Sequence, residues 1–211
     1  MADLAVESID ALDDELLGRV RKIYEDAFRV ELRVPFSELT RQGDADQAFV
    51  ALECKTPAGF AALRLLSSVE WSFLRYFAVG AERRSQGLGR QFWQLLQLAL
   101  RRESWPSCIV FEVEDPSEPD APEAERVIRE RRIAFWTACG ARLLPVPGYV
   151  LPDYTASGTT EPMLLMAATP ASGRPPQGDG IRRLVLAIYA DRYGMAPDDP
   201  LVSRALASVA P

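Results

Sequence analysis

The chain contains no histidine, and only three of its 211 residues are cysteine. The missing imidazole excludes Ser-His-Asp and Cys-His catalytic arrangements and the commonest zinc sites. Cys54, Cys108 and Cys139 are odd in number and have no paired spacing, so we expect reduced, mostly buried thiols and no metal. Acid–base chemistry must therefore come from carboxylates, tyrosine, lysine, cysteine or water.

Long apolar runs and an excess of positive charge are also missing. No apolar run reaches the length of a membrane span, and the first residues lack the basic region and apolar core of a signal peptide. The formal net charge of −6 argues against a nucleic-acid-binding surface. We therefore expect a cytoplasmic protein with neither a nucleic acid nor a membrane as its partner.

The most informative segment is a short run with two glycines, Arg84-Ser85-Gln86-Gly87-Leu88-Gly89. It lies between an apolar run at 73–79, typical of a buried strand, and a second at 92–100 that predicts a helix. Glycine lets a backbone approach a ligand closely, and the first turn of a helix presents free N–H groups. Such a turn suits a phosphate or pyrophosphate. The alternative is a turn that only packs a helix on a sheet.

Two common phosphate-binding loops do not fit this segment. The dinucleotide fingerprint requires a third glycine where Phe92 stands, and a Walker A loop requires Gly-Lys-Ser/Thr. The pattern that remains, Arg-x-x-Gly-x-Gly after a strand that ends in Ala-Val, resembles the acyl-CoA loop of the GNAT superfamily of N-acetyltransferases. The resemblance implies that backbone N–H groups from Arg84 to Gly89 hold the pyrophosphate of acetyl-CoA. It also implies that Phe77, Ala78 and Val79 offer backbone groups to the pantetheine arm.

The predicted order of elements supports the same resemblance over residues 1–170. Strands are predicted at 2–8, 47–54, 59–66, 72–79, 107–113, 148–151 and 163–168, and helices at 13–30, 37–42, 89–102 and 123–139. The segment from Thr56 to Gly59 is predicted to be a hairpin turn. The fold class implied is α/β, with a mixed, mostly antiparallel central sheet flanked by helices.

A second region follows at residues 171–211. It begins with a linker rich in proline and glycine, and then helical spacing appears at 181–193 and 200–209. We expect this C-terminal helical extension to pack on the acyltransferase domain of residues 1–170. A cover over the active site and a homodimer contact are the alternatives.

The resemblance also directs attention to carboxylates that could accept a proton from the attacking amine. The strand before the glycine loop, where the family often places that carboxylate, contains no Asp or Glu. The next predicted strand contains Phe111-Glu112-Val113, similar to the Leu-Glu-Val of many family members. We therefore predict Glu112 as the general base, acting directly or through water; a structural carboxylate is the alternative. Glu114 lies on the same face of the strand as Glu112, because successive side chains of a strand alternate between its two faces.

The proton donor to the departing thiolate is the point at which this chain departs from the family pattern. The family often has a tyrosine late in the helix predicted at 123–139, but here Trp136 stands at that position. Tyr149 and Tyr154, from the next strand and loop, are the candidates for the general acid, with aromatic packing as the alternative. Arg83 or Arg84 could add positive charge beside the phosphates.

Together these features predict an acetyl-CoA-dependent N-acetyltransferase. An acetyl group would move to a primary amine by direct attack, and the amine could belong to a small molecule or to a protein. An acyl-CoA-binding or sensor module with impaired catalysis is the main alternative, because Trp136 replaces the tyrosine. A structural or interaction protein with an incidental glycine turn is a third possibility.

Overall fold

The computed structural model describes residues 4–41, 43–119, 121–153, 160–170 and 173–210. The chain divides into two compact units, the first made of residues 1–65 and 74–107 and the second of residues 66–73 and 108–211. Within the described residues the strands are ordered β1-β2-β3-β4-β5-β8-β6, with β7 paired to β8. All described pairings are antiparallel except that of β4 with β5. The expected mixed, mostly antiparallel sheet with flanking helices is thus confirmed. None of the helices in these ranges is both long and apolar enough to cross a membrane.

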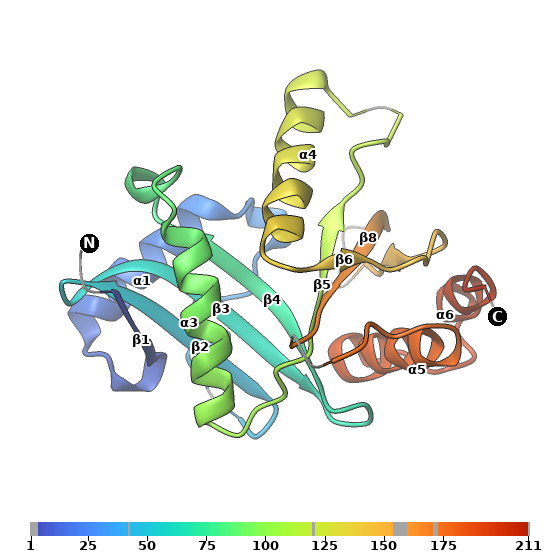
Figure 1. Ribbon diagram of the computed structural model, residues 1–211, viewed down its shortest axis with the longest axis horizontal. Coiled ribbons are helices and arrows are strands. Elements are labelled where there is room, and N and C mark those ends of the chain that lie inside the picture. The colour runs from blue at the N-terminus through green and yellow to red at the C-terminus, as the bar shows by residue number, and fades with distance from the viewer. Residues whose placement is uncertain (1–3, 42, 120, 154–159, 171–172, 211) are drawn as a thin grey trace. The chain divides into compact units, whose positions relative to one another are not determined.

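The first unit contains the N-terminal strands and the helices that cover them. Its elements are β1 (Leu4–Ser8), η1 (Ile9–Ala11), α1 (Asp14–Ala27), η2 (Val30–Leu32), α2 (Phe36–Leu39), β2 (Asp46–Glu53), β3 (Thr56–Leu66), the later part of β4 (Trp71–Val79), η3 (Ala81–Arg83) and α3 (Leu88–Arg102). Figure 1 shows α1 and α3 on opposite faces of these strands.

Alternation along β4 explains how both faces are filled. Tyr76 points into the buried cluster beneath α1, where its ring lies 5.0 Å from that of Tyr24. The neighbouring Phe77 points to the other face and stacks on Phe92 of α3, with ring centroids 4.8 Å apart. Successive strand side chains point to opposite faces, so one strand anchors both helices. Because α3 is fixed in this way, the glycine loop that precedes it has a defined position within the first unit.

The hairpin between β2 and β3 corrects one prediction. The turn was predicted at Thr56 to Gly59, but Thr56 already begins β3, and the turn consists of Cys54 and Lys55, whose φ angles are 48° and 64°. A two-residue turn with positive φ at both positions matches the twist of the flanking strands. Gly59 serves packing instead, since a Cβ there would lie 3.0 Å from the Ala78 carbonyl oxygen.

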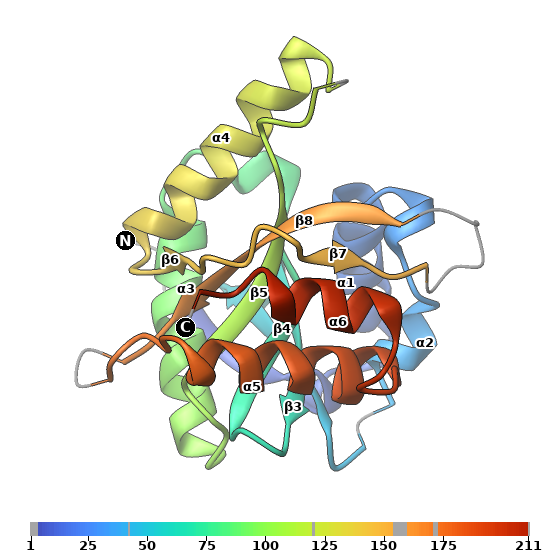
Figure 2. The ribbon, with the colours of Figure 1, turned by 90° about the vertical axis from the view of Figure 1, so that its right-hand side faces the viewer.

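The second unit contains the remaining strands and the C-terminal helices. Its elements are the early part of β4, β5 (Ile109–Glu114), α4 (Glu123–Ala138), β6 (Arg142–Leu143), β7 (Val150–Leu151), β8 (Glu161–Ala168), α5 (Asp179–Ala187), the π-helical turn η4 (Ile188–Arg192) and α6 (Pro200–Ala207). The parallel register of β4 with β5 pairs Ser72 with Ile109 and Phe73 with Val110. In Figure 2, α5 and α6 lie side by side.

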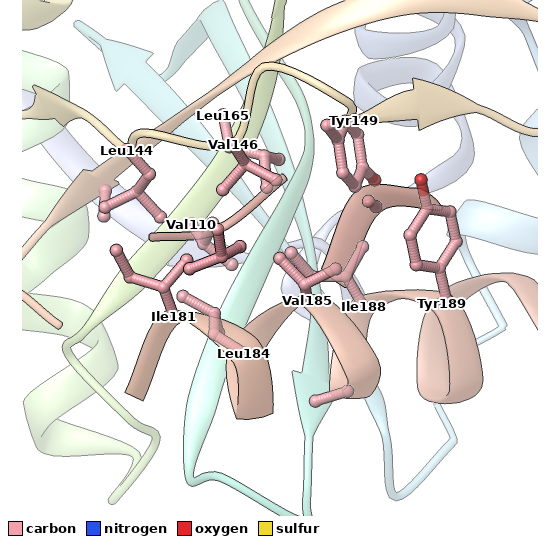
Figure 3. Close-up of a cluster of buried hydrophobic side chains, with 14 of the residues drawn as sticks. Val110, Leu144, Val146, Tyr149, Leu165, Ile181, Leu184, Val185, Ile188 and Tyr189 are labelled. Carbon is pink, nitrogen blue, oxygen red and sulfur yellow. The ribbon is translucent and has the colours of Figure 1, made fainter. Parts of the chain in front are cut away.

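The C-terminal helices share a core with the strands of this unit. Ile181, Leu184 and Val185 of α5 are buried against Val110 of β5 and Leu165 of β8 (Figure 3). The spacing predicts a single helix over residues 181–193, but these residues do not form one α-helix. The α-helix ends at Ala187 and a π turn follows, so the end of this segment departs from regular geometry.

Candidate functional site

Residues 80–87 connect β4 to α3 in the first unit, and together with Leu88 and Gly89 of the first turn of α3 they form the glycine loop. Ser85 and Gly87 both have positive φ, 61° and 82°, and Gly87 is the residue that precedes the first turn of α3. Glycine adopts this left-handed conformation without the steric cost that other residues carry. A Cβ at Gly87 would meet no atom within 4 Å, so the space beside it is open. Leu88 is buried beneath the loop and anchors it to the core.

The start of α3 differs from the start of α1 in a way that suits an anion. In α1, the side chain of Asp13 accepts a hydrogen bond from the Leu16 backbone N–H at 2.9 Å. The α3 start has no such side-chain cap and no acidic residue in its first turn. Within the described part of the chain, the backbone N–H groups of residues 85–89 have no backbone acceptor. Free N–H groups at the positive end of a helix can bind a phosphate.

The arginines around the loop have separate surroundings. Arg83 forms an ion pair with Glu53 at the end of β2. The Nε group of Arg84 donates to the Val79 carbonyl oxygen at 3.2 Å, which ties the loop to the end of β4. The exposed Arg90 lies in the first turn of α3, a position where a cation is unfavourable unless an anion lies nearby. Sequence reasoning did not single out Arg90, although its place three residues after Gly87 is visible in the sequence.

The residues predicted to face the pantetheine arm lie in the last part of β4. Phe77 and Val79 are partly buried, and Ala78 is buried. The register of β4 with β5 comprises Ser72 and Phe73, so these three residues come later in the strand. Where a strand extends beyond the residues that pair with its neighbour, its backbone groups on that side can pair with an extended ligand. At Val79 the carbonyl oxygen also accepts the hydrogen bond from Arg84.

In the second unit, Glu112 on β5 is the centre of a hydrogen-bonded cluster. The Tyr149 hydroxyl donates to Oε1 of Glu112 at 2.5 Å. The Tyr193 hydroxyl lies 2.8 Å from both Oε1 and Oε2. The structure thus brings together the two predicted catalytic residues, Glu112 and Tyr149, although they are 37 positions apart in the sequence. It adds Tyr193, which sequence reasoning missed.

The surroundings of this cluster shift its proton affinities. Burial raises the pKa of Glu112 above its ordinary value, while the hydrogen bonds from Tyr149 and Tyr193 and the charge of Arg192 act in the opposite direction. Burial is also the main reason why the pKa of Tyr149 is well above 10, with the charge of Glu112 adding to it. A partly buried carboxylate with a raised pKa is a better proton acceptor than a solvated one.

A third tyrosine, Tyr189, packs beside the cluster, and its hydroxyl bonds to Val150 and not to Glu112. The ring of Tyr189 stacks on that of Tyr149 with centroids 5.2 Å apart, and the two rings lie next to each other in Figure 3. The Tyr189 hydroxyl donates to the Val150 carbonyl oxygen at 2.8 Å and accepts from the Val150 N–H at 3.2 Å. Burial raises the pKa of Tyr189 to about 12. Its hydroxyl is thus bonded to backbone and not to a charge.

Two further candidate residues, Trp136 and Glu114, have a packing role and a pairing role respectively. Trp136 packs against Phe111, with ring centroids 4.5 Å apart. Glu114 forms an ion pair with Arg132 of α4. Tyr154 lies outside the described residues.

Comparisons with known proteins bear on the family and the fold of this chain. The Acetyltransferase (GNAT) family matches residues 17–127. The comparison with curated proteins found no match. Among solved structures, an acetyltransferase of the GNAT family from Bacteroides thetaiotaomicron is similar with a TM-score of 0.70 and 21% identity, covering 90% of this chain and 99% of that one.

Two further solved structures are similar at lower scores. The ribosomal-protein-S18-alanine N-acetyltransferase from Escherichia coli has a TM-score of 0.52 and 18% identity, covering 82% of this chain and 99% of that one. An aminoglycoside 6'-N-acetyltransferase complexed with coenzyme A has a TM-score of 0.57 and 16% identity, covering 81% of this chain and 98% of that one. At these identities the structural likeness shows the fold. Because the family match covers more than half of the chain, the protein belongs to the GNAT family of acetyltransferases.

Proposed function

We propose that this member of the GNAT family is an N-acetyltransferase that moves an acetyl group from acetyl-CoA to a primary amine. The observation that carries the proposal is the uncapped start of α3, where a left-handed Gly87 and free N–H groups form a cradle for an anion. The pyrophosphate of acetyl-CoA supplies an anion of the right kind. One similar structure is named as a complex with coenzyme A, which supports the choice of ligand.

In the proposed reaction, the neutral amine nitrogen attacks the thioester carbonyl carbon, a C–N bond forms and the C–S bond breaks. Glu112 takes the proton that the amine loses. Tyr149 gives its proton to the thiolate and recovers one from Glu112 along their 2.5 Å hydrogen bond. The protons balance without a metal or a covalent enzyme intermediate.

The acceptor is proposed at the level of a primary amine. Similar structures are named for acetylation of an alanine of a ribosomal protein and of an aminoglycoside. Both a small molecule and a protein are therefore open as acceptors for this chain.

The test is the variant Glu112→Gln, which keeps the size of the side chain and removes its basicity. We expect kcat to fall by about 10²- to 10⁴-fold, the usual contribution of a general base, while the affinity for acetyl-CoA is unchanged. Glu114→Gln is the matched control, because Glu114 lies two residues further along β5 and pairs with Arg132. Equal rates for the Glu112→Gln and Glu114→Gln variants would contradict the role of Glu112.

One observation favours the alternative of a CoA-binding module with impaired catalysis. The position at which the family often has a tyrosine is occupied by Trp136, which packs on Phe111. Under that alternative the wild-type chain binds acetyl-CoA but acetylates none of a panel of amines, and Glu112→Gln changes neither property.

A further inference from the structure

The cluster around Glu112 includes a residue from the C-terminal region. Tyr193 stands 81 positions after Glu112, directly after the π turn η4. The Tyr193 hydroxyl oxygen lies 2.8 Å from both Oε1 and Oε2 of Glu112. Because a hydroxyl has one proton, this geometry directs the proton between the two carboxylate oxygens. Tyr149 approaches Oε1 alone. The two donors together fix both the position and the plane of the carboxylate.

Tyr193 is itself held in place by its surroundings. Its ring makes an edge contact with Phe73, at a centroid distance of 6.5 Å, and lies 6.4 Å from the ring of Tyr189. The guanidinium of Arg192 lies 5.0 Å from the centroid of the same ring, within the range of a cation–π interaction. The preceding residues Ile188 and Tyr189 are fully buried, which anchors the π turn in the core. A hydroxyl presented by so constrained a ring has little freedom to leave the carboxylate.

We propose that Tyr193 is a positioning residue for Glu112, so that residues 179–193, from the start of α5 to the residue after η4, form part of the reacting centre. This inference rests on the proposed function, because it assigns Tyr193 a role through the proposed base. It gives residues 179–193 a purpose beyond covering a hydrophobic core. A base held in one orientation reaches its substrate with a smaller loss of conformational freedom.

Several ionisable groups face Glu112 and set its proton affinity together. The hydroxyls of Tyr149 and Tyr193 and the charge of Arg192 on η4 favour the carboxylate, whereas burial and the charge of Glu161 on β8 favour the protonated acid. Burial is the largest influence, so the pKa of Glu112 is raised. Removing the Tyr193 hydroxyl takes away a group that favours the ionised form. The pKa of Glu112 then rises further.

The experiment compares Tyr193→Phe with Tyr189→Phe in the full-length protein. Both variants remove one hydroxyl from the same aromatic group and keep the ring, but only Tyr193 bonds to Glu112, while Tyr189 bonds to Val150. The ionisation of Glu112 is followed by NMR of protein labelled with ¹³C at the glutamate side-chain carboxyls, with Glu112→Gln identifying the signal. The ascending limb of kcat/KM against pH is measured on the same variants.

We expect Tyr193→Phe to move both the NMR midpoint and the kinetic limb upward by about one to two pH units, the equivalent of one hydrogen bond to a charged group. Tyr189→Phe should leave both unchanged. A midpoint that Tyr193→Phe does not move would overturn the proposed role of Tyr193. A midpoint that moves while the kinetic limb stays in place would instead contradict the assignment of Glu112 as the base, and with it the proposed function of the cluster.

A second replacement covers the case in which Tyr193→Phe does not fold. Incorporation of 3-fluorotyrosine at position 193 keeps the ring and the hydroxyl but makes the phenol a stronger acid and hydrogen-bond donor. The midpoint of Glu112 should then move downward, opposite to the shift in the phenylalanine variant. An unchanged midpoint in this protein would also overturn the proposal.

Discussion

The glycine loop and the Glu112 cluster differ in how their hydrogen-bonding groups are used. In the loop, residues 81–87 are exposed, and the backbone N–H groups of residues 85–89 have no backbone acceptor among the described residues. In the cluster, Tyr149 is 1% exposed and its hydroxyl is bonded to Glu112. Free donors favour the binding of an anion from solution, whereas bonded donors fix a group of the protein itself. The first arrangement fits the binding role proposed for the loop, and the second fits the proton-transfer role proposed for the cluster.

The largest effect expected on ligand binding comes from charge at the loop. Gly87→Asp should weaken acetyl-CoA binding by at least about 100-fold, because a unit charge about 4 Å from another costs about 1–4 kcal/mol and a pyrophosphate carries more than one. Calorimetric titration of the purified variant measures the change. The same variant should leave the ¹³C signal of Glu112 where it is.

Two controls separate charge from backbone strain at this position. Gly87→Asn has nearly the same shape, and asparagine also tolerates the left-handed conformation, so it should bind markedly better than the aspartate variant. Gly140→Asp places the same charge at another left-handed glycine, with φ 91° and no neighbour within 4 Å, and should bind normally. Equal losses for the aspartate and asparagine variants at position 87 would contradict an anion site.

The raised pKa of Glu112 should affect how the stability of the protein depends on pH. The folded-state pKa of Glu112 is raised above its ordinary value of 4.5, so the chain binds more protons folded than unfolded above that pH. The contribution of Glu112 to stability is fully present below about pH 4.5 and is lost as the pH rises through the raised value. In Glu112→Gln this loss is absent.

Urea unfolding of the wild-type chain and of Glu112→Gln between pH 4 and pH 8 measures this difference. As the pH rises, we expect the free energy of unfolding of the variant to increase relative to that of the wild type. Parallel curves would show that Glu112 has the same proton affinity in both states, and would contradict the account of the cluster.

The smallest effect concerns the arginine side chains beside the loop. Arg90→Ala should weaken acetyl-CoA binding by about 2- to 5-fold at low salt and less at high salt, as expected for an exposed charge at a helix start. Arg83→Ala should change the affinity less, because Arg83 is already paired with Glu53. A larger loss for Arg83→Ala than for Arg90→Ala would reverse this ranking, and calorimetry at two salt concentrations measures both.

The two regions also differ in how far the sequence could predict them. The loop is contiguous and depends on the backbone, so Gly87 and the apolar runs on either side were sufficient to locate it. Glu112 could be selected from its strand, but its contact with Tyr193 joins residues 81 positions apart. No local pattern contains such a contact, because it depends on how α5 and η4 pack against the strands of the second unit.

The hairpin between β2 and β3 shows a different limit of local reasoning. Pro57 and Gly59 are typical turn residues, yet both lie in β3 and the turn is formed by Cys54 and Lys55. Gly59 is required by the close approach of the Ala78 carbonyl oxygen and of Phe92 on α3. The sequence predicted the elements of the fold well, whereas the purpose of individual glycines depended on tertiary packing.

The central claim is that the glycine loop of this GNAT-family chain holds the pyrophosphate of acetyl-CoA. Calorimetric titration of the folded wild-type protein with acetyl-CoA tests it most directly, with acetylpantetheine, which lacks the pyrophosphate, as the comparison ligand. The account predicts saturable binding of acetyl-CoA and much weaker binding of acetylpantetheine. Absence of acetyl-CoA binding, or equal affinity for the two ligands, would contradict it.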